Sequence, residues 1–288
     1  DIKSNIVVIM TFNQITIVIT SYKSEEKILK CLKSVNNQCK IIVIENSQNT
    51  SFKKKIEENF TNVECFIAGQ NLGYAKGNNL GLSKVKTKFA LILNPDAELE
   101  KNTLTNFFNR VNNIKNFAII GPATQDEKNM QNNFKEFREV NSVKGFAMFL
   151  NLDEFKDIGF FDDNFFIYLE EIDLCRRLRQ KDKKIFVDPN ILINHQGGSS
   201  HDEKYNFEME LSRNWHWMWS SFYYTKKHKG FFYALLYVLD KLISAVLKYT
   251  FYLLILKSSK KLIYKQRISG LINSIIGKPS WYRPFNNK

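Results

Sequence analysis

The segment that decides the fold runs from residue 15 to residue 44 and reads ITIVITSYKSEEKILKCLKSVNNQCKIIVI. Its two ends, 15–20 and 40–44, are compact runs of β-branched residues, a composition typical of buried strands. Between them, the apolar residues of Glu25–Val35 recur at helical spacing. The segment therefore predicts a strand, a helix and a second strand.

The same alternation continues toward the C-terminus. We expect further strands at 63–67, 88–93 and 117–120, and helices over about Ala75–Lys84 and after Lys101. Strands that alternate with helices predict an α/β fold, in which a mostly parallel sheet is covered by helices on both faces. In such folds, ligands bind at the carboxyl ends of the strands.

A second block, from about Val143 to Ser200, contains shorter apolar runs. It predicts a helix over Leu169–Gln180 and a pair of strands near 184–187 and 191–194. From Glu208 onward, the composition changes sharply to aromatic residues and lysines. We therefore place a domain boundary there, with one domain over residues 1–207 and a helical region over residues 208–288.

Length and composition exclude several classes of protein. The 288 residues are 44% apolar and 25% charged, which excludes a disordered or collagen-like chain. The four cysteines form no C-x-x-C pair and lie in predicted helices or strands, which favours reduced thiols over disulfides or zinc. The apolar run Ile6–Met10 lacks a basic leader and a cleavage site, so we expect no secretory signal and a cytoplasmic domain.

The net charge of +13 is concentrated at the C-terminal end. From Lys226 to Lys288, thirteen Lys and Arg residues stand against the single acid Asp240, so this segment carries +12 and residues 1–225 carry +1. An enzyme acting on nucleic acid should be basic around its active half, so no nucleic-acid partner is expected. A segment that is both basic and apolar instead indicates an anionic lipid surface.

The strongest short signal is LILNPDAE at 91–98. A predicted strand ends there at Asn94-Pro95 and brings Asp96 and Glu98 to the carboxyl edge of the sheet. A carboxylate at this edge can hold a divalent cation, whose preference for oxygen ligands suits a diphosphate substrate. The alternative is that Asp96 only caps the next helix.

A second signal is QNLGYAKGNNLGL at 70–82, where Gly73, Gly77 and Gly81 lie among asparagines. Such a loop can bring backbone close to a ligand, although it matches neither the dinucleotide-binding nor the P-loop pattern. A plain turn is the alternative, because clusters of glycine and asparagine are common in turns.

A third signal is FFIYLEEIDLCRRLRQ at 165–180, where Glu170, Glu171 and Asp173 precede a run of arginines. Acids first and bases last suit the helix dipole, which is a purely structural explanation. The aromatic residues just before the acids are a second feature. They could shape an acceptor pocket and raise the pKa of a neighbouring carboxylate, as a general base requires.

A fourth signal is INHQGGSS at 193–200. His195 ends a predicted strand there and precedes the pair Gly197-Gly198. A lone histidine is usually structural. At a sheet edge that already carries acids, it is also a candidate metal ligand or phosphate contact.

These four segments, in this order, resemble the family-2 glycosyltransferases of the GT-A fold, and especially their bacterial rhamnosyltransferase-like branch. The most specific match is GFFDDNFFIYLEEIDLCRRLR at 159–179, which is similar to the pattern G-G-F-D-E-x-F-F-x-Y-x-E-D-x-D-L-x-x-R. The resemblance covers about residues 14–225. It implies a Rossmann-like sheet with flanking helices, a nucleotide-sugar half at about 14–121 and an acceptor half at about 122–207.

The resemblance also implies the site residues. The segment NPDAE looks like the D-x-D motif, with Asp96 facing a Mg²⁺ or Mn²⁺ ion, Asn94 in place of the first aspartate, and His195 as a further metal ligand. Glu45 stands where an aspartate is usual. The residues implied for the nucleotide sugar are Thr20, Ser21, Tyr22, Glu45, Asn46, Asn71, Gly73, Lys76, Gly77, Asn94 and Asp96.

By position, Glu171 takes the place of the acid that deprotonates the acceptor hydroxyl, with Glu170 and Asp173 as alternatives. The implied reaction is a single inverting displacement, in which the metal stabilises the leaving diphosphate. The expected donor is dTDP-rhamnose and the expected product a cell-surface polysaccharide. A UDP-sugar that supplies galactose, glucose or N-acetylglucosamine is the alternative donor.

The apolar stretch 231–256 is long enough to cross a bilayer, but Asp240, Lys241 and Lys248 interrupt it. On a helix these three residues share one stripe, and the remaining face is apolar. We therefore expect an amphipathic helix that lies peripherally on the cytoplasmic face of the inner (plasma) membrane, where a polyprenyl-diphosphate-linked acceptor would meet the enzyme. The alternatives are a helix packed on the catalytic domain, a homodimer contact and a true span.

A nucleotidyltransferase and a non-catalytic scaffold are the alternatives from other classes of protein. A nucleotidyltransferase should show a basic, glycine-rich signature near its first strand, and the region after Thr20 has none. A non-catalytic membrane scaffold of the same fold is suggested by Asn94 and Glu171, which depart from the common pattern of the family.

Overall fold

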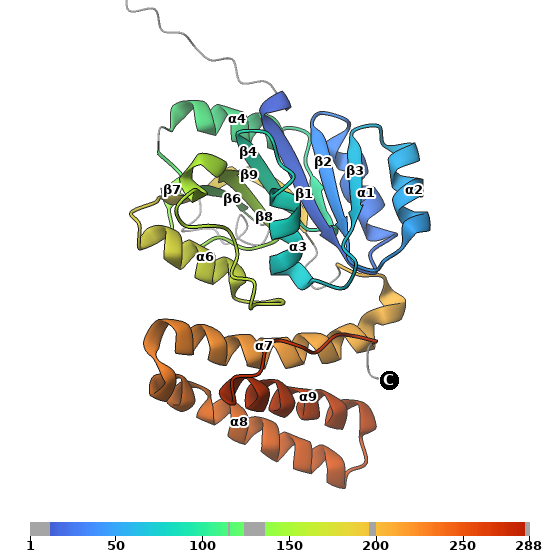
Figure 1. Ribbon diagram of the computed structural model, residues 1–288, viewed down its shortest axis with the longest axis vertical. Helices are drawn as coiled ribbons and strands as arrows, with labels where there is room; N and C mark the ends of the chain where they lie inside the picture. Colours follow the sequence, from blue (N-terminus) through green and yellow to red (C-terminus); the bar gives the residue numbers. More distant parts are fainter. Residues whose placement is uncertain (1–11, 115, 124–135, 196–199, 286–288) are drawn as a thin grey trace, which may run out of the picture.

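A computed structural model of the chain describes residues 12–114, 116–123, 136–195 and 200–285. The run Ile6–Met10, for which we expect no secretory signal, lies outside these residues. The pair Gly197-Gly198 also lies outside them. The described part consists of an α/β body and a layer of long helices beneath it (Figure 1).

A sheet of nine strands forms the centre of the described part, in the order β3-β2-β1-β4-β8-β6-β9-β5, with β7 paired to β9. Strands β1 to β4 pair in parallel, and so do β6 and β9, whereas β8 runs antiparallel to both β4 and β6. The predicted mostly parallel sheet is therefore confirmed. The strands are β1 (Ile15–Ser21), β2 (Lys40–Glu45), β3 (Val63–Ile67), β4 (Phe89–Leu93), β5 (Ala97–Leu99), β6 (Ile119–Ala123), β7 (Arg138–Glu139), β8 (Ala147–Asn151) and β9 (Ile185–His195).

Helices cover both faces of the sheet because alternate strand residues point to opposite sides. In β1, Ile17 and Ile19 pack with α1, α2 and α4, whereas Val18 packs with α3 and α6. Each such side chain, when fully buried, stabilises the fold by about 1.5–3 kcal/mol. The helices are α1 (Lys27–Val35), α2 (Thr50–Asn59), α3 (Gly73–Leu82), α4 (Thr103–Asn113) and α6 (Glu170–Arg179), with short 3-10 turns η1 (Phe12–Gln14), η2 (Leu152–Phe155) and η3 (Glu203–Tyr205).

The prediction of two separate strands near 184–187 and 191–194 is wrong, because both stretches belong to the single strand β9. Pro189 does not end the strand. The pairing with β6 shifts register instead, since Pro122 pairs with Asp188 and Ala123 pairs with Leu192. A proline is tolerated at such an irregularity, where its missing N–H is not needed for the ladder.

Beyond the sheet, three long helices follow from Asn206 to Ile275, beginning close to the expected boundary. Helix α7 (Asn206–Lys229) lies against the α/β body, and α8 (Phe231–Leu254) and α9 (Ser258–Ile275) lie on its far side (Figure 1). We call these three helices the helical layer. Within the described residues, no helix has the length and hydropathy needed to cross a membrane.

Candidate active site

A cavity opens at the carboxyl ends of β1, β2 and β4, between the α/β body and α7. We call it the central cavity. It lies at the edge of the sheet where α/β folds bind ligands. Of the residues predicted to contact a nucleotide sugar, six line it: Thr20, Tyr22, Asn46, Asn71, Gly73 and Asn94.

One wall of the central cavity is the loop before α3, which Asn46 holds in place. The Asn46 Nδ2 donates to the Gly73 carbonyl oxygen at 3.2 Å, and the Leu72 N–H donates to Asn46 Oδ1 at 3.4 Å. Gly73 has a φ of 75°, and a Cβ there would overlap the ring and carbonyl of Phe166. A side chain at this position would therefore push the loop away from Phe166, which also lines the cavity.

Five predicted residues do not line the cavity: Ser21, Glu45, Lys76, Gly77 and Asp96. The carboxylate of Glu45 accepts hydrogen bonds from the N–H groups of Ser47 at 3.0 Å and Asn49 at 2.8 Å, and so holds the loop after β2. A Cβ on Gly77 would lie 2.5 Å from Thr20 Cγ2, so this glycine lets α3 approach β1. Ser21 is buried and Lys76 is exposed.

Asp96 lies beside the cavity with His195, because β5 pairs with β9 and sets Ala97 opposite His195. The His195 Nε2 is 3.4 Å from Asp96 Oδ1, and Ser200 Oγ donates to the same oxygen at 2.9 Å. The His195 ring stacks on Phe146 with centroids 4.5 Å apart. Its Nε2 is buried and has no hydrogen-bond partner in the described part of the chain.

This geometry fits one divalent cation shared by Asp96 and His195. Two ligands of one ion, each about 2.0–2.2 Å from it, lie roughly 3 Å apart, and a buried imidazole nitrogen without a partner suits a metal. Residues 12–114, 116–123, 136–195 and 200–285 hold no cluster of three or more potential His, Cys, Asp or Glu ligands. Substrate oxygens and water would therefore complete the coordination shell.

The carboxyl pair Glu170 and Glu171 begins α6. The two residues before it, Tyr168 and Leu169, both have positive φ, at 75° and 69°. Consecutive non-glycine residues in this region cost energy, and such strain clusters at functional sites. The strained turn fixes how the chain enters α6, whose first two residues carry the carboxyl groups.

Both carboxyl groups are harder to ionise than usual. Burial and the neighbouring Glu171 raise the pKa of Glu170 well above its ordinary value, and burial raises the pKa of Glu171. The Oε2 of Glu170 has no hydrogen-bond partner among the described residues. Raised pKa values of this origin are the usual way in which proteins prepare carboxyl groups for proton transfer.

Tyr74 connects the carboxyl pair to the central cavity. Its side chain lines the cavity, and its hydroxyl donates a short hydrogen bond to the Gly145 carbonyl. Burial raises the pKa of Tyr74, and the nearby carboxylates of Glu170 and Glu171 raise it further. The Tyr74 hydroxyl and Glu171 lie close to each other, because a Cβ on Gly145 would be 3.3 Å from Tyr74 Oη and 3.7 Å from Glu171 Cβ.

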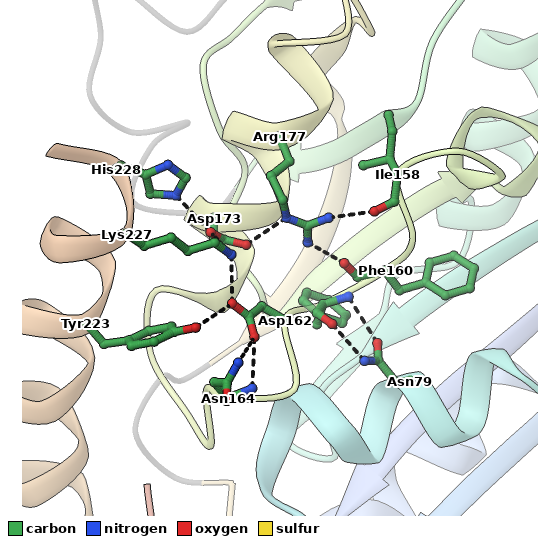
Figure 2. A network of polar contacts seen from close by, with 11 residues as sticks. Asn79, Ile158, Phe160, Asp162, Asn164, Asp173, Arg177, Tyr223, Lys227 and His228 are labelled. Atoms are coloured by element: carbon green, nitrogen blue, oxygen red, sulfur yellow. Dashed lines mark hydrogen bonds and ion pairs between the residues drawn. The ribbon is translucent and has the colours of Figure 1, made fainter. Parts of the chain in front are cut away.

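Asp173 is in different surroundings (Figure 2). Its carboxylate is fully buried and lies 2.8 Å from Arg177 Nε, 2.7 Å from Lys227 Nζ and 2.8 Å from His228 Nε2. Lys227 also lies 2.7 Å from Asp162. The network joins α6 to α7, so the geometry favours a structural role for Asp173 over proton transfer.

Several lining residues were missed by the sequence analysis. Ser200 is the last residue of the segment quoted around His195, and His201 directly follows it, which was the only signal for them. Ser212 and Arg213 on α7, and Pro284 near the C-terminus, carry no local motif. Their approach to the cavity depends on how the helical layer packs, which a local pattern does not encode.

The comparison with protein families identifies the chain. The family model for Glycosyl transferase family 2 matches residues 16–176, which is more than half of the sequence. The chain belongs to glycosyl transferase family 2. The matched stretch of this family 2 chain contains Asp96 and the carboxyl pair, and it ends before His195 and the helical layer.

Individual relatives agree with this assignment. The chain is 25% identical over 199 residues to the low-salt glycan biosynthesis hexosyltransferase Agl10 of Haloferax volcanii, an alignment that covers 60% of this chain and 64%, less than two thirds, of that protein. The structure is similar to the mannosyltransferase PcManGT of Pyrobaculum calidifontis in complex with GDP-Man and Mn²⁺, at 11% identity and a TM-score of 0.58 over 91% of this chain and 87% of that one.

It is also similar to S. aureus TarS 1-349 in complex with UDP-GlcNAc, at 13% identity and a TM-score of 0.52 over 95% of this chain and 93% of that one. At these identities, the two structures support the GT-A fold alone. The predicted fold is confirmed.

Proposed function

We propose that this family 2 enzyme transfers a sugar from a nucleoside diphosphate donor to a saccharide hydroxyl, with inversion at the anomeric carbon. The observation that carries the proposal is that the carboxyl pair lies near Tyr74, which lines the central cavity. The cavity would hold the donor, and the pair would face the acceptor. This arrangement supplies a base on one side of the reacting carbon and a leaving-group site on the other.

In the proposed reaction, Glu171 takes the proton of the acceptor hydroxyl while the hydroxyl oxygen forms a bond to the anomeric carbon. The bond from that carbon to the diphosphate oxygen breaks, and the nucleoside diphosphate leaves with the electron pair. Glu170 is buried more deeply than Glu171, so it would keep its proton and leave the charge on Glu171. A positioned base of this kind contributes about 10²–10⁴-fold to the rate.

We propose that Asp96 and His195 hold Mg²⁺ or Mn²⁺ together with the donor diphosphate. When bound, the ion would stabilise the negative charge that develops on the leaving group. The support is the position of His195 Nε2, and PcManGT was obtained with Mn²⁺. Ser200 would orient the Asp96 carboxylate through its hydrogen bond.

For the donor we propose dTDP-rhamnose, on the resemblance of residues 159–179 to the rhamnosyltransferase-like branch. A UDP-sugar is the second candidate, because TarS was obtained with UDP-GlcNAc. The product would be a cell-surface polysaccharide.

We further propose that the acceptor is linked to a polyprenyl diphosphate and that the enzyme binds peripherally to the cytoplasmic face of the inner (plasma) membrane. The support is the surface of α8. Among the described residues, all exposed large apolar side chains lie after Asn206, and fourteen of them fall between Phe231 and Leu256. A soluble surface rarely exposes so large an apolar patch unless it binds a partner.

Helix α8 has two apolar faces. Ala234, Val238 and Ala245 are buried against α7 and α9, whereas an outer face turns away from both helices. The outer face carries the exposed acid Asp240, which at about 100° per residue lies on the same side of α8 as Leu236 and Leu247. Its most exposed apolar members are Phe232 at 80%, Leu236 at 74%, Leu247 at 65% and Leu254 at 76%.

Lipid fits the outer face better than a second copy of the chain. Lys241 and Lys248 flank it, and the segment from Lys226 to Lys288 carries +12. A symmetric dimer would bring these like charges together, because its two surfaces are the same patch. Anionic lipid headgroups would instead attract them, at about 1 kcal/mol for each basic residue near the surface.

A catalytically inactive scaffold of the same fold is the remaining alternative. The two functions are separated by titration calorimetry of the purified chain with dTDP and with UDP, each with and without Mn²⁺, and again on Asp96→Ala. We expect one nucleotide to bind in a manner that needs both the metal and Asp96. No binding of either nucleotide by folded protein would contradict the transferase proposal and favour the scaffold.

A further inference from the structure

The chain after α9 returns to the central cavity. Residues 278–285 run back along α7 (Figure 1), and His216 of α7 holds them at two points. Ser280 Oγ donates to His216 Nδ1 at 2.9 Å, and His216 Nε2 donates to the Tyr282 carbonyl oxygen at 2.9 Å. Trp219 Nε1 donates to the Lys278 carbonyl oxygen at 3.0 Å. We call residues 278–285 the return segment.

The return segment brings Arg283 to the wall of the cavity. The Arg283 Nε donates to the Asn71 carbonyl oxygen at 3.1 Å, and its guanidinium carbon lies 3.9 Å from the centroid of the Phe166 ring. Asn71 and Phe166 both line the cavity, and so does Pro284, the next residue along. Arg283 is therefore fixed at the cavity by contacts on two sides.

The surroundings of Arg283 are unusual for a partly buried cation. Its three recorded hydrogen bonds go to the carbonyl oxygens of Asn71, Ser280 and Tyr282, and no carboxylate within the described residues lies at ion-pair distance. Burial lowers the pKa of Arg283 to about 10. A buried charge without a counter-charge is costly, so an anion in the cavity would be strongly favoured.

We infer that Arg283 binds the diphosphate of the nucleotide-sugar donor and that the return segment thereby completes the donor site. The inference rests on the proposed function. The hydrogen bonds of Arg283 engage Nε and Nη1, so the Nη2 amino group remains to donate charge-assisted hydrogen bonds to phosphate oxygens. Because Arg283 also donates to the Asn71 carbonyl oxygen, donor binding would be coupled to the position of the return segment.

The test is titration calorimetry of the full chain, with Mn²⁺, using UDP and dTDP as diphosphate probes and uridine and thymidine as nucleoside probes. Arg283→Gln removes the charge, and Arg283→Lys keeps the charge without the planar guanidinium that stacks on Phe166. Lys278→Gln is the matched control, because this exposed side chain of the same segment carries the same charge. Circular dichroism establishes that each variant is folded.

We expect Arg283→Gln to weaken binding of the preferred diphosphate by about tenfold or more and to leave nucleoside binding and the Lys278→Gln control unchanged. The affinity of Arg283→Lys for the diphosphate should lie between those of the wild type and Arg283→Gln. If Arg283→Gln does not fold, Arg283→Lys provides the test. Equal diphosphate binding by Arg283→Gln and the wild type would overturn the inference and leave the proposed function intact. An equal loss of nucleoside binding would overturn it as well, since Arg283 would then serve the nucleoside end. No diphosphate binding by the wild type would contradict the proposed function itself.

Discussion

Glu170 and Glu171 are adjacent in the sequence, yet their side chains lie in different surroundings. Glu170 is 4% exposed and has an oxygen with no hydrogen-bond partner in the described part, whereas Glu171 is partly exposed. Burial penalises the charged form of a carboxyl group, so the penalty is larger at Glu170. The pair should therefore share one negative charge, which stays mainly on Glu171 and leaves it able to accept a proton.

At this scale we expect Glu171→Gln to lower turnover by about 10²–10⁴-fold, because the amide cannot take the acceptor proton. Donor binding should stay unchanged, since the pair does not line the central cavity. The measurement is steady-state turnover with the preferred nucleotide sugar, together with calorimetric binding of the nucleotide.

Glu170→Gln is the matched control, because an amide replaces a carboxyl group that is expected to be neutral already. It should keep most of the activity. The pH profile adds an independent readout. Turnover of the wild type should rise as pH increases through the raised pKa of the pair, because the base must lose its proton, and Glu171→Gln should lack this rise. A full loss of turnover in Glu170→Gln with activity retained in Glu171→Gln would reverse the two roles.

At the scale of elements, His216 decides whether the return segment stays on α7. The ring is fully buried and neutral, because Nδ1 must accept from Ser280 while Nε2 donates to Tyr282. Burial lowers the pKa of His216 to about 3. Protonation would remove the acceptor that Ser280 uses, so acid should weaken the attachment of the return segment.

The free energy of unfolding should fall as pH drops below the histidine pKa of the unfolded chain, about 6.5. Below that value His216 binds a proton in the unfolded chain but not in the folded chain. Stability therefore decreases by about 1.4 kcal/mol per pH unit down to the folded pKa. Between pH 7 and pH 5, His216 should account for a loss of about 2 kcal/mol. Urea unfolding of the wild type and of His216→Gln at both pH values measures it. Equal losses in the two proteins would show that His216 does not titrate in this way.

The elements themselves could be predicted where the signal is local. The alternation of β-branched runs and helical spacing places β1 to β4 and α6 correctly, because burial on both faces requires those residue types. The prediction of two strands where β9 runs is wrong, because Pro189 lies at an irregularity in the pairing with β6 and does not end the strand. Asp173 shows the same limit at a site. Its motif position suggests chemistry. Its pair with Arg177 is a local i,i+4 contact within α6, but its pairs with Lys227 and His228 of α7 depend on tertiary packing.

On the scale of the whole molecule, function depends on contacts between distant parts of the sequence. Asn71 and Arg283 are 212 positions apart and share a hydrogen bond at the cavity wall. No periodicity or motif near Arg283 marks it, because its role comes from the return of the chain along α7. The polar stripe of α8 could be predicted from the sequence, whereas the division of its apolar side into a buried face and an outer face required the packing of α7 and α9.

Within the helical layer, α7 lies next to the α/β body and α8 lies on the side away from it (Figure 1). The apolar outer face belongs to α8. We expect the chain to sediment with vesicles that contain anionic phosphatidylglycerol and to bind vesicles of zwitterionic phosphatidylcholine more weakly, because both the apolar face and the lysines contribute.

The double variant Leu236→Glu and Leu247→Glu places two charges on the outer face and should abolish sedimentation with either kind of vesicle while leaving nucleotide binding unchanged. Phe207→Glu is the matched control, because Phe207 is an exposed apolar residue at the start of α7 and lies off this face. Added salt should weaken binding of the wild type to the anionic vesicles, since the lysine contribution is screened. The opposite result has two parts: the wild type does not bind either kind of vesicle, and analytical ultracentrifugation shows a dimer for the wild type but a monomer for the double variant. That result would assign the outer face to a second copy of the chain.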